Sequence, residues 1–559
     1  MALPPARRTL IDRVIGAIDP AREFRRIRAR QAVDAISASS GQRPSGWGGG
    51  GFGGYQGARR DRAGLSGWAV SGGSANADLL FDLPLLRERS RDLERNSPLA
   101  GGAINTVVTS VVGGGPMLKA RLDREALGLS DAEAEAWEGD AERLWLEWSE
   151  SSDADVTRVQ PFNDLCSTVC RAALVSGDVV ALKRFVERPG RPWGLCYQLI
   201  EADRLSNPGF GRDTVTMAGG VEMDADGAPL RYHVLDRHPG NIDTVGRKWI
   251  PVEAFAAGRR QVYHLFLRLR PEQARGVPYL APVVEALKQL SRYSDAEIMA
   301  AVVNACFAVV SKTAAPQGMA PLDQMTTAVA NPATGQPKGE VKLDQAGLVV
   351  DLDPNEEIAA FTPGRPSAAF DPFVMAILRQ IGVALELPFE VLVKHFTASY
   401  SAARAALLEA AKFFKVRRQW LARSWCQPVY EDVLTEAVAR GRLRAPGFLA
   451  ASGLRQAWCG AHWVWPSAGQ IDPTKEVEAA IMRVNGSFST LDQETAELTG
   501  GDWDDVHQQQ VKELRRRTAD GLLGVALSGA ATTSPKAAPG KEPVLPPEQQ
   551  EQTDKKEVA

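Results

Sequence analysis

Leucines recur at helical spacing from Leu79 onward and predict a helix that ends at Asn96. A second apolar repeat begins at Ser97 and stops at the glycines 113–115, which break helices. A folded domain is therefore expected to start near Leu79.

Between residues 131 and 270 the apolar spacing switches between the helical period and the alternation of a half-buried strand. Helices are predicted over 131–149 and 162–175, and strands over 179–185, 195–200 and 230–235. This mixture predicts an α+β domain.

The longest helical pattern of the chain follows the turn at 276–278. It runs from Ala281 to Ser311 and would be about 45 Å long. Apolar positions are dense near both of its ends, whereas Ser291 and Ser294 interrupt the middle. The predicted helix is therefore apolar at its ends.

A polar insertion occupies 313–364. Pro, Gly and Asp become frequent there, and short alternating runs such as 341–343 and 348–350 predict a small β unit. Two lysines and seven acidic residues give the insertion a charge of −5.

Helices return after the insertion. The predicted elements are helices over 370–385 and 402–440, separated by Pro388, a strand near 458–465 and short helices over 473–524. Asp502 is expected to cap one of the short helices, because a carboxylate can accept a hydrogen bond from the first free N–H groups.

The two ends of the chain differ from this patterned middle. Apolar residues among arginines over 10–18 predict a short basic amphipathic helix, and the first thirty residues, charge +5, lack the apolar core of a secretory signal. Glycines dominate 45–57 and predict a mobile arm, while the composition after Ser534 predicts a disordered tail. The longest apolar run, 298–310, is too short to span a bilayer.

Composition narrows the class of protein. Of 559 residues, 44% are apolar and 24% charged, which is ordinary for globular domains, and the length predicts three or four of them. A net charge of −3 excludes a protein that coats nucleic acid with its whole surface, so any contact with a polyanion must be local. Six cysteines without paired spacing provide no disulfide framework and favour a reducing compartment.

Motifs for catalysis or cofactor binding are weak. Gly46, Gly48 and Gly51 match a phosphate loop in spacing only, because no predicted strand precedes them. Cys166 and Cys170 lie one helical turn apart, where two buried thiols are a more frequent explanation than two metal ligands. The six histidines match no zinc or hydrolase motif. No cofactor or metal is expected.

The segment 391–404 combines cations and rings between two predicted helices. It contains Lys394, His395, Phe396 and Tyr400. Cations neutralise phosphates and rings stack on bases, so contact with a nucleic acid is one interpretation.

The helix that follows carries six basic residues against Glu409 between Arg404 and Arg423. Its apolar residues keep a seven-residue repeat. Taken alone, this pattern is more typical of an amphipathic helix with a solvated basic face.

Four blocks, in order and spacing, resemble the lambda-type portal proteins of tailed bacteriophages. They are 89–114, containing Arg-Asn-Ser-Pro-Leu, 275–278, Arg-Gly-Val-Pro, 389–404, from Phe-Glu-Val-Leu to Tyr-Ser-Ala-Ala-Arg, and 471–476, Ile-Asp-Pro-Thr-Lys-Glu. The resemblance covers about 79–523, and its specificity comes from the four blocks together.

This resemblance implies an α+β portal-type fold with a mixed wing domain, long stem helices, a small β-containing clip and a helical crown, assembled as a ring of normally twelve copies. Mapped on this chain, it implies a basic and glycine-rich flexible arm at 1–65, the wing at 66–275, the first stem helix at 276–312, the clip at 313–364, the second stem helix at 365–388, the tunnel loop at 389–404, the long wing helix and closing strand at 405–470, the crown at 471–524 and a disordered tail at 525–559.

The resemblance also implies a function and partners. The ring would sit at one capsid vertex of the virion, after assembly in the host cytoplasm, and would form the channel for double-stranded DNA during packaging and ejection. The implied partners are further copies of the chain, the terminase large subunit, the major capsid protein or scaffold, and head-completion or connector proteins. No membrane contact is implied.

Candidate functional residues follow from this mapping. The tunnel-loop candidates are Lys394, His395, Phe396, Tyr400 and Arg404, the stem candidates are Lys288 and Arg292, and the clip docking candidates are Asp351, Asp353, Glu356 and Glu357. Family members commonly carry an acidic or small residue and an Asn where this chain has Lys394, His395 and Ser399, so loop contacts of relatives do not carry over directly.

Two other functions stay open from the residues alone. One is a metal-dependent nuclease or nucleotide-using packaging enzyme built on acid pairs of the insertion, although acids at that density usually form a solvated face. The other is a peripheral nucleic-acid-binding protein that uses the basic N-terminal segment. An assembly near twelve times 60.3 kDa would favour the ring over both.

Overall fold

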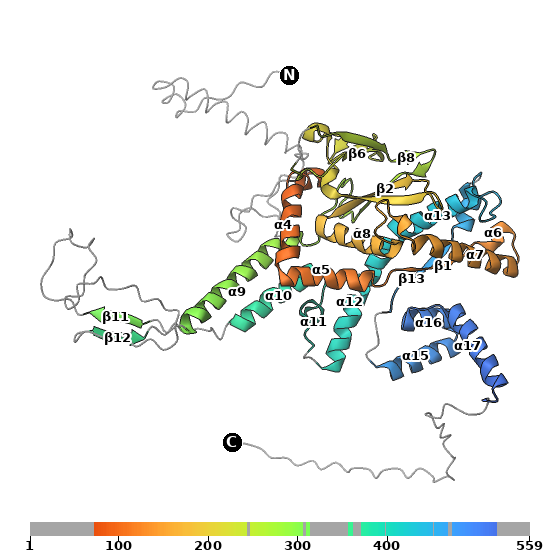
Figure 1. Ribbon diagram of the computed structural model, residues 1–559. Helices are drawn as coiled ribbons and strands as arrows, with labels where there is room; N and C mark the ends of the chain where they lie inside the picture. Colours follow the sequence, from red (N-terminus) through yellow and green to blue (C-terminus); the bar gives the residue numbers. More distant parts are fainter. Residues whose placement is uncertain are drawn as a thin grey trace, which may run out of the picture. The chain divides into compact units, whose positions relative to one another are not determined.

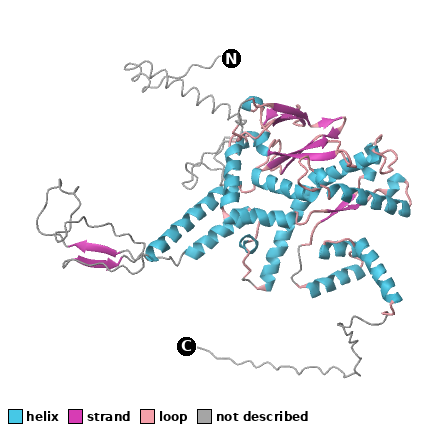
Figure 2. Ribbon diagram, viewed as in Figure 1, coloured by secondary structure: helices cyan, strands magenta, loops and turns pink. Residues whose placement is uncertain are grey.

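The computed structural model describes residues 72–242, 246–305, 309–313, 356–360, 370–396, 399–450, 452–467 and 472–522. Contacts divide the chain into Met1–Gly72 and Gly73–Ala559, and all elements below belong to the second unit. The predicted helix at 10–18, the glycine-rich arm and the C-terminal tail lie outside the described residues. Figures 1 and 2 show the described elements as helices combined with short strands.

Three helices open the described chain, α3 (Ala75–Leu79), α4 (Leu83–Asn96) and α5 (Pro98–Val111). Ser97 separates α4 from α5, and its side chain accepts a hydrogen bond from the N–H of Ala100. Ile104, Val107 and Val111 of α5 are buried at helical spacing. The two helices predicted from the first apolar repeats are confirmed.

A three-stranded antiparallel sheet in the order β10-β2-β3 forms the centre of the α+β region. Its strands are β2 (Asp178–Phe185), β3 (Leu195–Glu201) and β10 (Val262–Phe266). Val179 and Ala181 of β2 face a core shared with helix α8 (Phe162–Ser176), whereas Val180 and Leu182 face a second core. Because successive side chains of a strand point to opposite faces, β2 contributes alternate residues to both cores.

A second antiparallel sheet packs on the other face of the central one. It contains β4 (Met217–Ala218), β5 (Val221–Met223), β6 (Pro229–Leu235) and β7 (Trp249–Glu253), and the ribbon of β8 (Phe255–Ala256) and β9 (Arg259–Arg260) follows. Tyr232 and Val234 of β6 pack with Val180 and Leu182. The central sheet therefore lies between helices and a second sheet (Figure 2).

One long helical path crosses the main core. It consists of α12 (Tyr400–Leu421), a π-helical turn (Ala422–Cys426) and α13 (Gln427–Ala439). Trp425 in the π turn is fully buried, with its ring centroid 5.0 Å from that of Tyr197 and 5.9 Å from that of Phe162. The π turn thus places an aromatic side chain at the centre of the core.

Helix α7 (Asp131–Ser149) closes this core and covers an edge strand. The ribbon beside it pairs β1 (Met117–Ala120) antiparallel with β13 (Ala461–Val464), and α6 (Arg124–Leu127) and α14 (Ser452–Trp458) flank the ribbon in sequence. The N–H groups of Ala120 and Leu122 donate to the carboxylates of Glu142 and Glu138 at 2.8 and 2.9 Å. Carboxylates of α7 thereby accept hydrogen bonds from backbone N–H groups that the pairing of β1 with β13 does not use.

The longest predicted helix is shorter than expected. After a 3₁₀ turn (Ala281–Val283), α9 spans Val284–Ala305, and Val309–Thr313 is the strand β11, paired antiparallel with β12 (Glu356–Ala360). The expectation of a helix up to residue 312 is therefore wrong, because periodicity alone does not distinguish a short apolar run in a helix from a strand. The predicted strands at 341–343 and 348–350 lie outside the described residues.

Helix α10 (Phe370–Ala384) confirms the prediction at 370–385 and packs beside α9 (Figure 1). The ring of Tyr293 lies 5.3 Å from that of Phe370 and 5.2 Å from that of Phe373. The last described helices are α15 (Pro473–Asn485), α16 (Leu491–Thr499) and α17 (Trp503–Ala519). Asp502 caps α17 as predicted, since its side chain accepts a hydrogen bond from the N–H of Asp504 at 2.8 Å.

Candidate functional site

The segment after α11 (Phe389–Val393) presents three predicted nucleic-acid-contacting side chains to solvent. Lys394 ends this helix with φ 57° and ψ 38°, a left-handed conformation that stops the helix. The N–H groups of Lys394 and His395 both donate to the carbonyl oxygen of Glu390. Lys394 and His395 are exposed, and Phe396 is 48% exposed. A cation, an imidazole and a ring thus follow one another in a single turn.

Tyr400 and Arg404 already belong to α12, so much of the segment 389–404 is helical rather than loop. Nη1 of Arg404 donates to Oη of Tyr400 at 3.4 Å. Tyr400 is 49% exposed. The structure therefore brings together these two of the five predicted tunnel-loop residues.

The basic residues of α12 and the π turn fall into two groups, of which the first packs inside the fold. The guanidinium of Arg418 donates to the carbonyl oxygens of Ser110, Val111 and Pro466 at 2.8, 3.2 and 2.9 Å, which ties α12 to the end of α5. Arg417 lies over the ring of Phe413 at 4.9 Å, and burial lowers the pKa of Arg417. These two arginines stabilise the fold.

Three other cations of α12 and the π turn are exposed. They are Lys412, Lys415 and Arg423. Nζ of Lys412 lies 2.6 Å from Oε2 of Glu409. The interpretation of a solvated basic face therefore holds for these three cations.

The predicted stem residues Lys288 and Arg292 lie one turn apart on the exposed face of α9. Leu287 and Leu290 are buried on the opposite side of that helix. Glu285 is exposed one turn before Lys288 and Asp295 one turn beyond Arg292, so two acids match the two cations on this face. Local neutrality is thus a property of the face itself.

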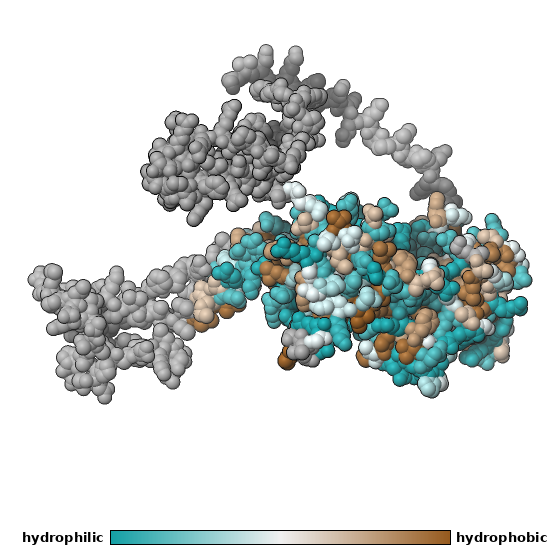
Figure 3. All heavy atoms as spheres, turned by 90° about the horizontal axis from the view of Figure 1, so that it is seen from above, coloured by the Kyte–Doolittle hydropathy of each residue, from teal (hydrophilic) through white to brown (hydrophobic). Residues whose placement is uncertain are grey.

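The far end of α9 leaves apolar side chains in solvent. Ile298 and Met299 are each 63% exposed and Val302 is 52% exposed. Figure 3 shows apolar surface at the end of the α9–α10 pair that adjoins the grey residues. A contiguous group of exposed apolar side chains often marks a surface that another protein molecule covers.

Two of the four predicted docking acids are described, and only by their backbone. Glu356 and Glu357 belong to β12, where their Cα partners are those of Thr313 and Lys312. Asp351 and Asp353 lie outside the described residues.

A buried ionic cluster that the sequence patterns did not indicate joins the start of α9 to the sheets. Its centre is Asp178, which has no exposed surface. Oδ1 of Asp178 lies 2.9 Å from Nη2 of Arg87, and Oδ2 lies 2.6 Å from Nε of Arg275 and 3.1 Å from Nε2 of His264. The four side chains come from α4, β2, β10 and the residues before α9, and we call them the Asp178 cluster.

Both arginines of the Asp178 cluster also bind main-chain carbonyl groups. Arg87 donates to Ser176, at 2.9 Å, and Arg275 donates to Leu205, Gly219 and Ala202, at 2.6 to 2.7 Å. Each buried charge is therefore paired and hydrogen-bonded, as burial of charge requires.

The electrostatics of the cluster favour one protonation state. Burial alone would raise the pKa of Asp178, but Arg275 and Arg87 hold it well below its ordinary value. Burial lowers the pKa of His264, against the opposing effect of Asp178. An ionised Asp178 and a neutral His264 are thus the favoured forms.

Two glycines allow the backbones of this junction to meet. A Cβ atom on Gly276 would lie 1.9 Å from the carbonyl oxygen of Gly177. Gly177 itself has φ +89°, a conformation that L side chains rarely adopt. The Arg-Gly pair at 275–276 was visible in the sequence, whereas its partner Asp178 lies far away along the chain.

A second buried polar group links α13 to the central sheet. Asp432 accepts hydrogen bonds from Oη of Tyr197 at 2.9 Å and Oη of Tyr263 at 2.5 Å, and lies 3.1 Å from Nζ of Lys183. Burial and the charge of Asp432 raise the pKa of both tyrosines, so they remain donors. This group stabilises the packing of helix on sheet.

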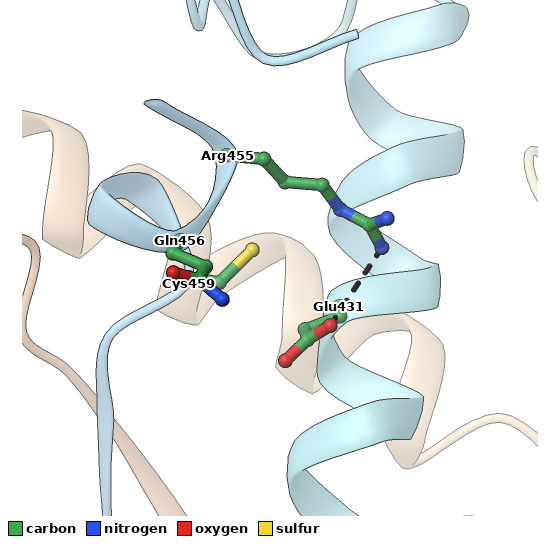
Figure 4. A pocket seen from close by; sticks show the side chains of 4 residues that line it. All are labelled: Glu431, Arg455, Gln456 and Cys459. Carbon is green, nitrogen blue, oxygen red and sulfur yellow. Dashed lines mark ion pairs between the residues drawn. The ribbon is translucent and has the colours of Figure 1, made fainter. Parts of the chain in front are cut away.

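One cavity among the described residues offers little for catalysis. Glu431, Arg455, Gln456 and Cys459 line this cavity (Figure 4). Its volume is about 150 Å³. Nη2 of Arg455 lies 3.7 Å from Oε2 of Glu431. Burial raises the pKa of Cys459 to about 12, so this thiol is protonated at neutral pH and is a poor nucleophile.

Cys166 and Cys170 are buried side chains of the α8 core, as expected. Burial raises the pKa of Cys170 to about 12. Within the described ranges, no three His, Cys, Asp or Glu side chains gather as a candidate metal site. A membrane-spanning helix of sufficient length and apolarity is likewise absent from the part of the chain that the structure describes.

Comparison with known proteins identifies relatives over most of the chain. The sequence profile of "Phage portal protein, lambda family" matches residues 61–418. Portal protein B of Escherichia phage lambda is 27% identical over 487 residues, which cover 84% of this chain and 91% of the lambda protein. The portal protein of Escherichia phage N15 is 28% identical with the same coverage of both chains.

Among the solved structures that resemble this chain in part are chains from gene transfer agent (GTA) particles. A chain from the neck of a native GTA particle, computed with C12 symmetry, has a TM-score of 0.38 and 16% identity, covering 75% of this chain and 93% of that one. A chain from the neck of an empty GTA particle, computed with C6 symmetry, has a TM-score of 0.39 and 15% identity, covering 74% and 92%.

Proposed function

This chain belongs to the lambda family of phage portal proteins, and on that premise we propose that it forms a ring, normally of twelve copies, at one vertex of a phage capsid. Its relatives are named portal proteins, which are structural components rather than enzymes. The chain is therefore not the nuclease or nucleotide-using enzyme that its acid pairs left open.

The observation that carries the ring is the exposed apolar end of α9. Ile298, Met299 and Val302 are more than half exposed in the single chain. A neighbouring copy related by rotation would cover them with a different face of its own, which is the kind of contact that closes rings. Burial of these side chains would then contribute to assembly.

The channel follows from the charges on the exposed face of α9. Lys288 and Arg292 attract phosphates, while Glu285 and Asp295, each one turn from one of these cations, offset them. Because each neutralised phosphate adds salt-sensitive affinity, a mixed face allows duplex DNA to slide rather than bind tightly. We assign α9 and α10 to the stem that surrounds the DNA during packaging and ejection, with 285–295 toward the DNA and only the far end of the same face, at Met299 and Val302, against a neighbouring copy.

The turn after α11 is the proposed point of closest contact with DNA. Lys394 and His395 are exposed, and Phe396 offers a ring next to them. Repeated around a ring, one lysine per copy makes a belt of positive charge at one height. Such a belt would hold the duplex lightly through its phosphates.

The β unit after α9 is the proposed docking surface for other assembly proteins. The segment 313–364 carries a charge of −5, and Glu356 and Glu357 lie on its strand β12. With Asp351 and Asp353, these acids would attract a basic surface of the terminase large subunit during packaging. Head-completion proteins would occupy the same surface later.

The remaining parts fit the other regions of a portal. We assign the two sheets and the helices around them to the wing, and α15 to α17 to the crown, which would meet the capsid protein or scaffold. The assembled ring would be a virion component, built in the host cytoplasm.

The mass of the purified assembly tests this proposal. A ring should appear near twelve times 60.3 kDa by light scattering and as an annulus in negative-stain images. The variant Ile298→Asp with Met299→Asp should dissociate it, because it places charges on the surface that a neighbouring copy would bury. Gln289→Asp, at an exposed position of the same helix, is the matched control and should leave the ring intact. A wild-type chain that stays monomeric at high concentration would refute the ring.

A further inference from the structure

The three crown helices have almost no apolar core of their own. Among the described residues 472–522, Ala480 is the one apolar side chain that is buried. Larger side chains remain in solvent, including Ile481 at 54%, Phe488 at 86% and Leu514 at 55%. Helices of this length are only marginally stable in water without tertiary packing. The crown helices therefore need an apolar surface outside their own three helices.

Polar contacts hold the crown helices together within one chain. Nε of Arg483 on α15 donates to Oε1 of Glu494 on α16 at 2.8 Å. Glu494 is buried, and its hydrogen bond with Arg483 lowers its pKa. This ion pair is a polar contact between α15 and α16.

Polar contacts also attach the crown to the ribbon of the same chain. Lys119 of β1 pairs with Asp502, and its Nζ lies 3.2 Å from Oδ2 of Asp504. Nη2 of Arg121 lies 2.9 Å from Oδ2 of Asp492. Because ion pairs account for this attachment, the apolar faces of α15 and α17 stay available.

The exposed apolar residues of α15 and α17 follow helical spacing and form a stripe along each helix. Val477 and Ile481 lie one turn apart on α15, and they are 43% and 54% exposed. Val506 and Leu514 lie two turns apart on α17, at 40% and 55%. An apolar stripe at helical spacing is the pattern of a helix that packs against another helix.

Charge along α17 indicates what covers these stripes. The first turn carries Asp504 and Asp505, whereas the last two turns carry Lys512, Arg515 and Arg516. The acidic end of one α17 therefore complements the basic end of another. In a ring, each copy would use its acidic end toward one neighbour and its basic end toward the other, which is a heterologous contact that propagates around the ring.

We propose that the crown core is completed between copies: the stripes on α15 and α17 pack on the crown of the next copy, with Asp505 facing its Arg515 and Arg516. This inference rests on the proposed ring. It adds that the crown helices are firmly ordered only after the ring has closed.

Hydrogen exchange on the full chain tests the proposal. Ring and subunit fractions are separated by size, and exchange is followed over 477–485 and 503–516. We expect at least ten-fold slower exchange in the ring. The double variant Val477→Gln with Ile481→Gln should lose most of this protection, whereas Glu478→Gln, an exposed change on the same helix, should keep it.

Charge reversal tests the proposed contact between Asp505 of one copy and Arg515 of the next. Asp505→Arg alone should weaken ring protection of the crown, and the combination with Arg515→Asp should restore it, although both changes oppose the helix dipole. Circular dichroism of the variants reports any loss of helix.

Three results decide the matter. A wild-type ring whose crown exchanges as fast as that of the free subunit overturns this inference and leaves the proposed ring intact. Crown protection that appears only when capsid or scaffold protein is added also overturns it, because the occupant is then not a second copy. A wild-type chain that forms no ring overturns both proposals.

Discussion

Asp178 shows how one buried carboxylate can join distant parts of a chain. Arg87, His264 and Arg275 all reach it, and they lie on α4, on β10 and before α9. Removing one charge from such a group leaves the others buried without compensation, which is far more destabilising than losing a surface pair.

Asp178→Asn should therefore lower the free energy of unfolding by about 3–5 kcal/mol. Urea unfolding followed by tryptophan fluorescence measures this change. Asp226→Asn, at an exposed position in a turn, should change stability by less than about 0.5 kcal/mol. Equal effects of the two substitutions would contradict the role given to the Asp178 cluster.

The same cluster should make stability depend on pH. The buried His264 has a pKa below its ordinary value of 6.5, so as pH falls through that value the unfolded chain binds a proton that the folded chain does not. The low pKa of Asp178 acts in the same direction at lower pH. The free energy of unfolding should thus decrease as pH falls from 7.5 to about 5.5.

His264→Gln keeps a donor for Asp178 but does not titrate, so it should flatten this pH dependence. Free energies of unfolding at the two ends of that pH range give the comparison. The exposed His507→Gln should leave the pH slope of the wild type in place. A slope that His264→Gln does not change would assign the acid sensitivity to other groups.

At the scale of elements, the junction before α9 depends on backbone contact. Gly276→Ala would place a Cβ atom 1.9 Å from the oxygen of Gly177, so we expect a loss of at least about 2 kcal/mol. Gly139→Ala in the exposed face of α7 meets no atom within 4 Å and should stabilise the protein by about 0.5–1 kcal/mol. Thermal unfolding of both variants checks the opposite signs.

Elements with a strong local signal could be predicted from the sequence. The helix at 131–149 begins with a capping box between Ser130 and Glu133, and its structure matches the prediction. The strand β11 could not be predicted, because its strand character depends on pairing with β12 beyond a long insertion. The Asp178 cluster was missed for the same reason, since its members meet only after the chain has folded.

The sequence indicates where basic residues gather, but not which of them are exposed and which pack inside the fold. Lys288, Arg292 and Lys394 are exposed, while their predicted contact with DNA stays a prediction. Arg417 and Arg418 belong to the same basic run as Lys415, yet they pack inside the fold. Helical spacing indicates the face of a residue, whereas a specific main-chain partner is set by tertiary structure.

At the scale of the whole molecule, the proposed belt of Lys394 side chains should affect DNA retention rather than ring assembly. Lys394→Glu should give rings of normal mass that retain packaged DNA less well at low salt, with the difference shrinking as salt is raised. Retention is measured by nuclease protection of filled particles. Wild-type retention at every ionic strength would exclude a channel position for Lys394.

Deletion of residues 1–45 should leave ring formation intact, because the proposed contacts between copies lie on α9 and the crown. Sizing by light scattering checks the ring, and filter binding compares DNA affinity. Loss of all DNA affinity together with an intact ring would instead favour the basic N-terminal segment as the nucleic-acid contact.

Arg87 and Arg275 grip the polypeptide main chain of their neighbours, at Ser176, Ala202, Leu205 and Gly219. A carbonyl oxygen belongs to the main chain, so these contacts depend on where the backbone lies, and at Gly219 a Cβ atom would lie 2.8 Å from Cγ of Arg275. The segment before α9 is consequently fixed to both sheets by the path of their backbones, so any shift of either sheet would be transmitted directly to the start of α9.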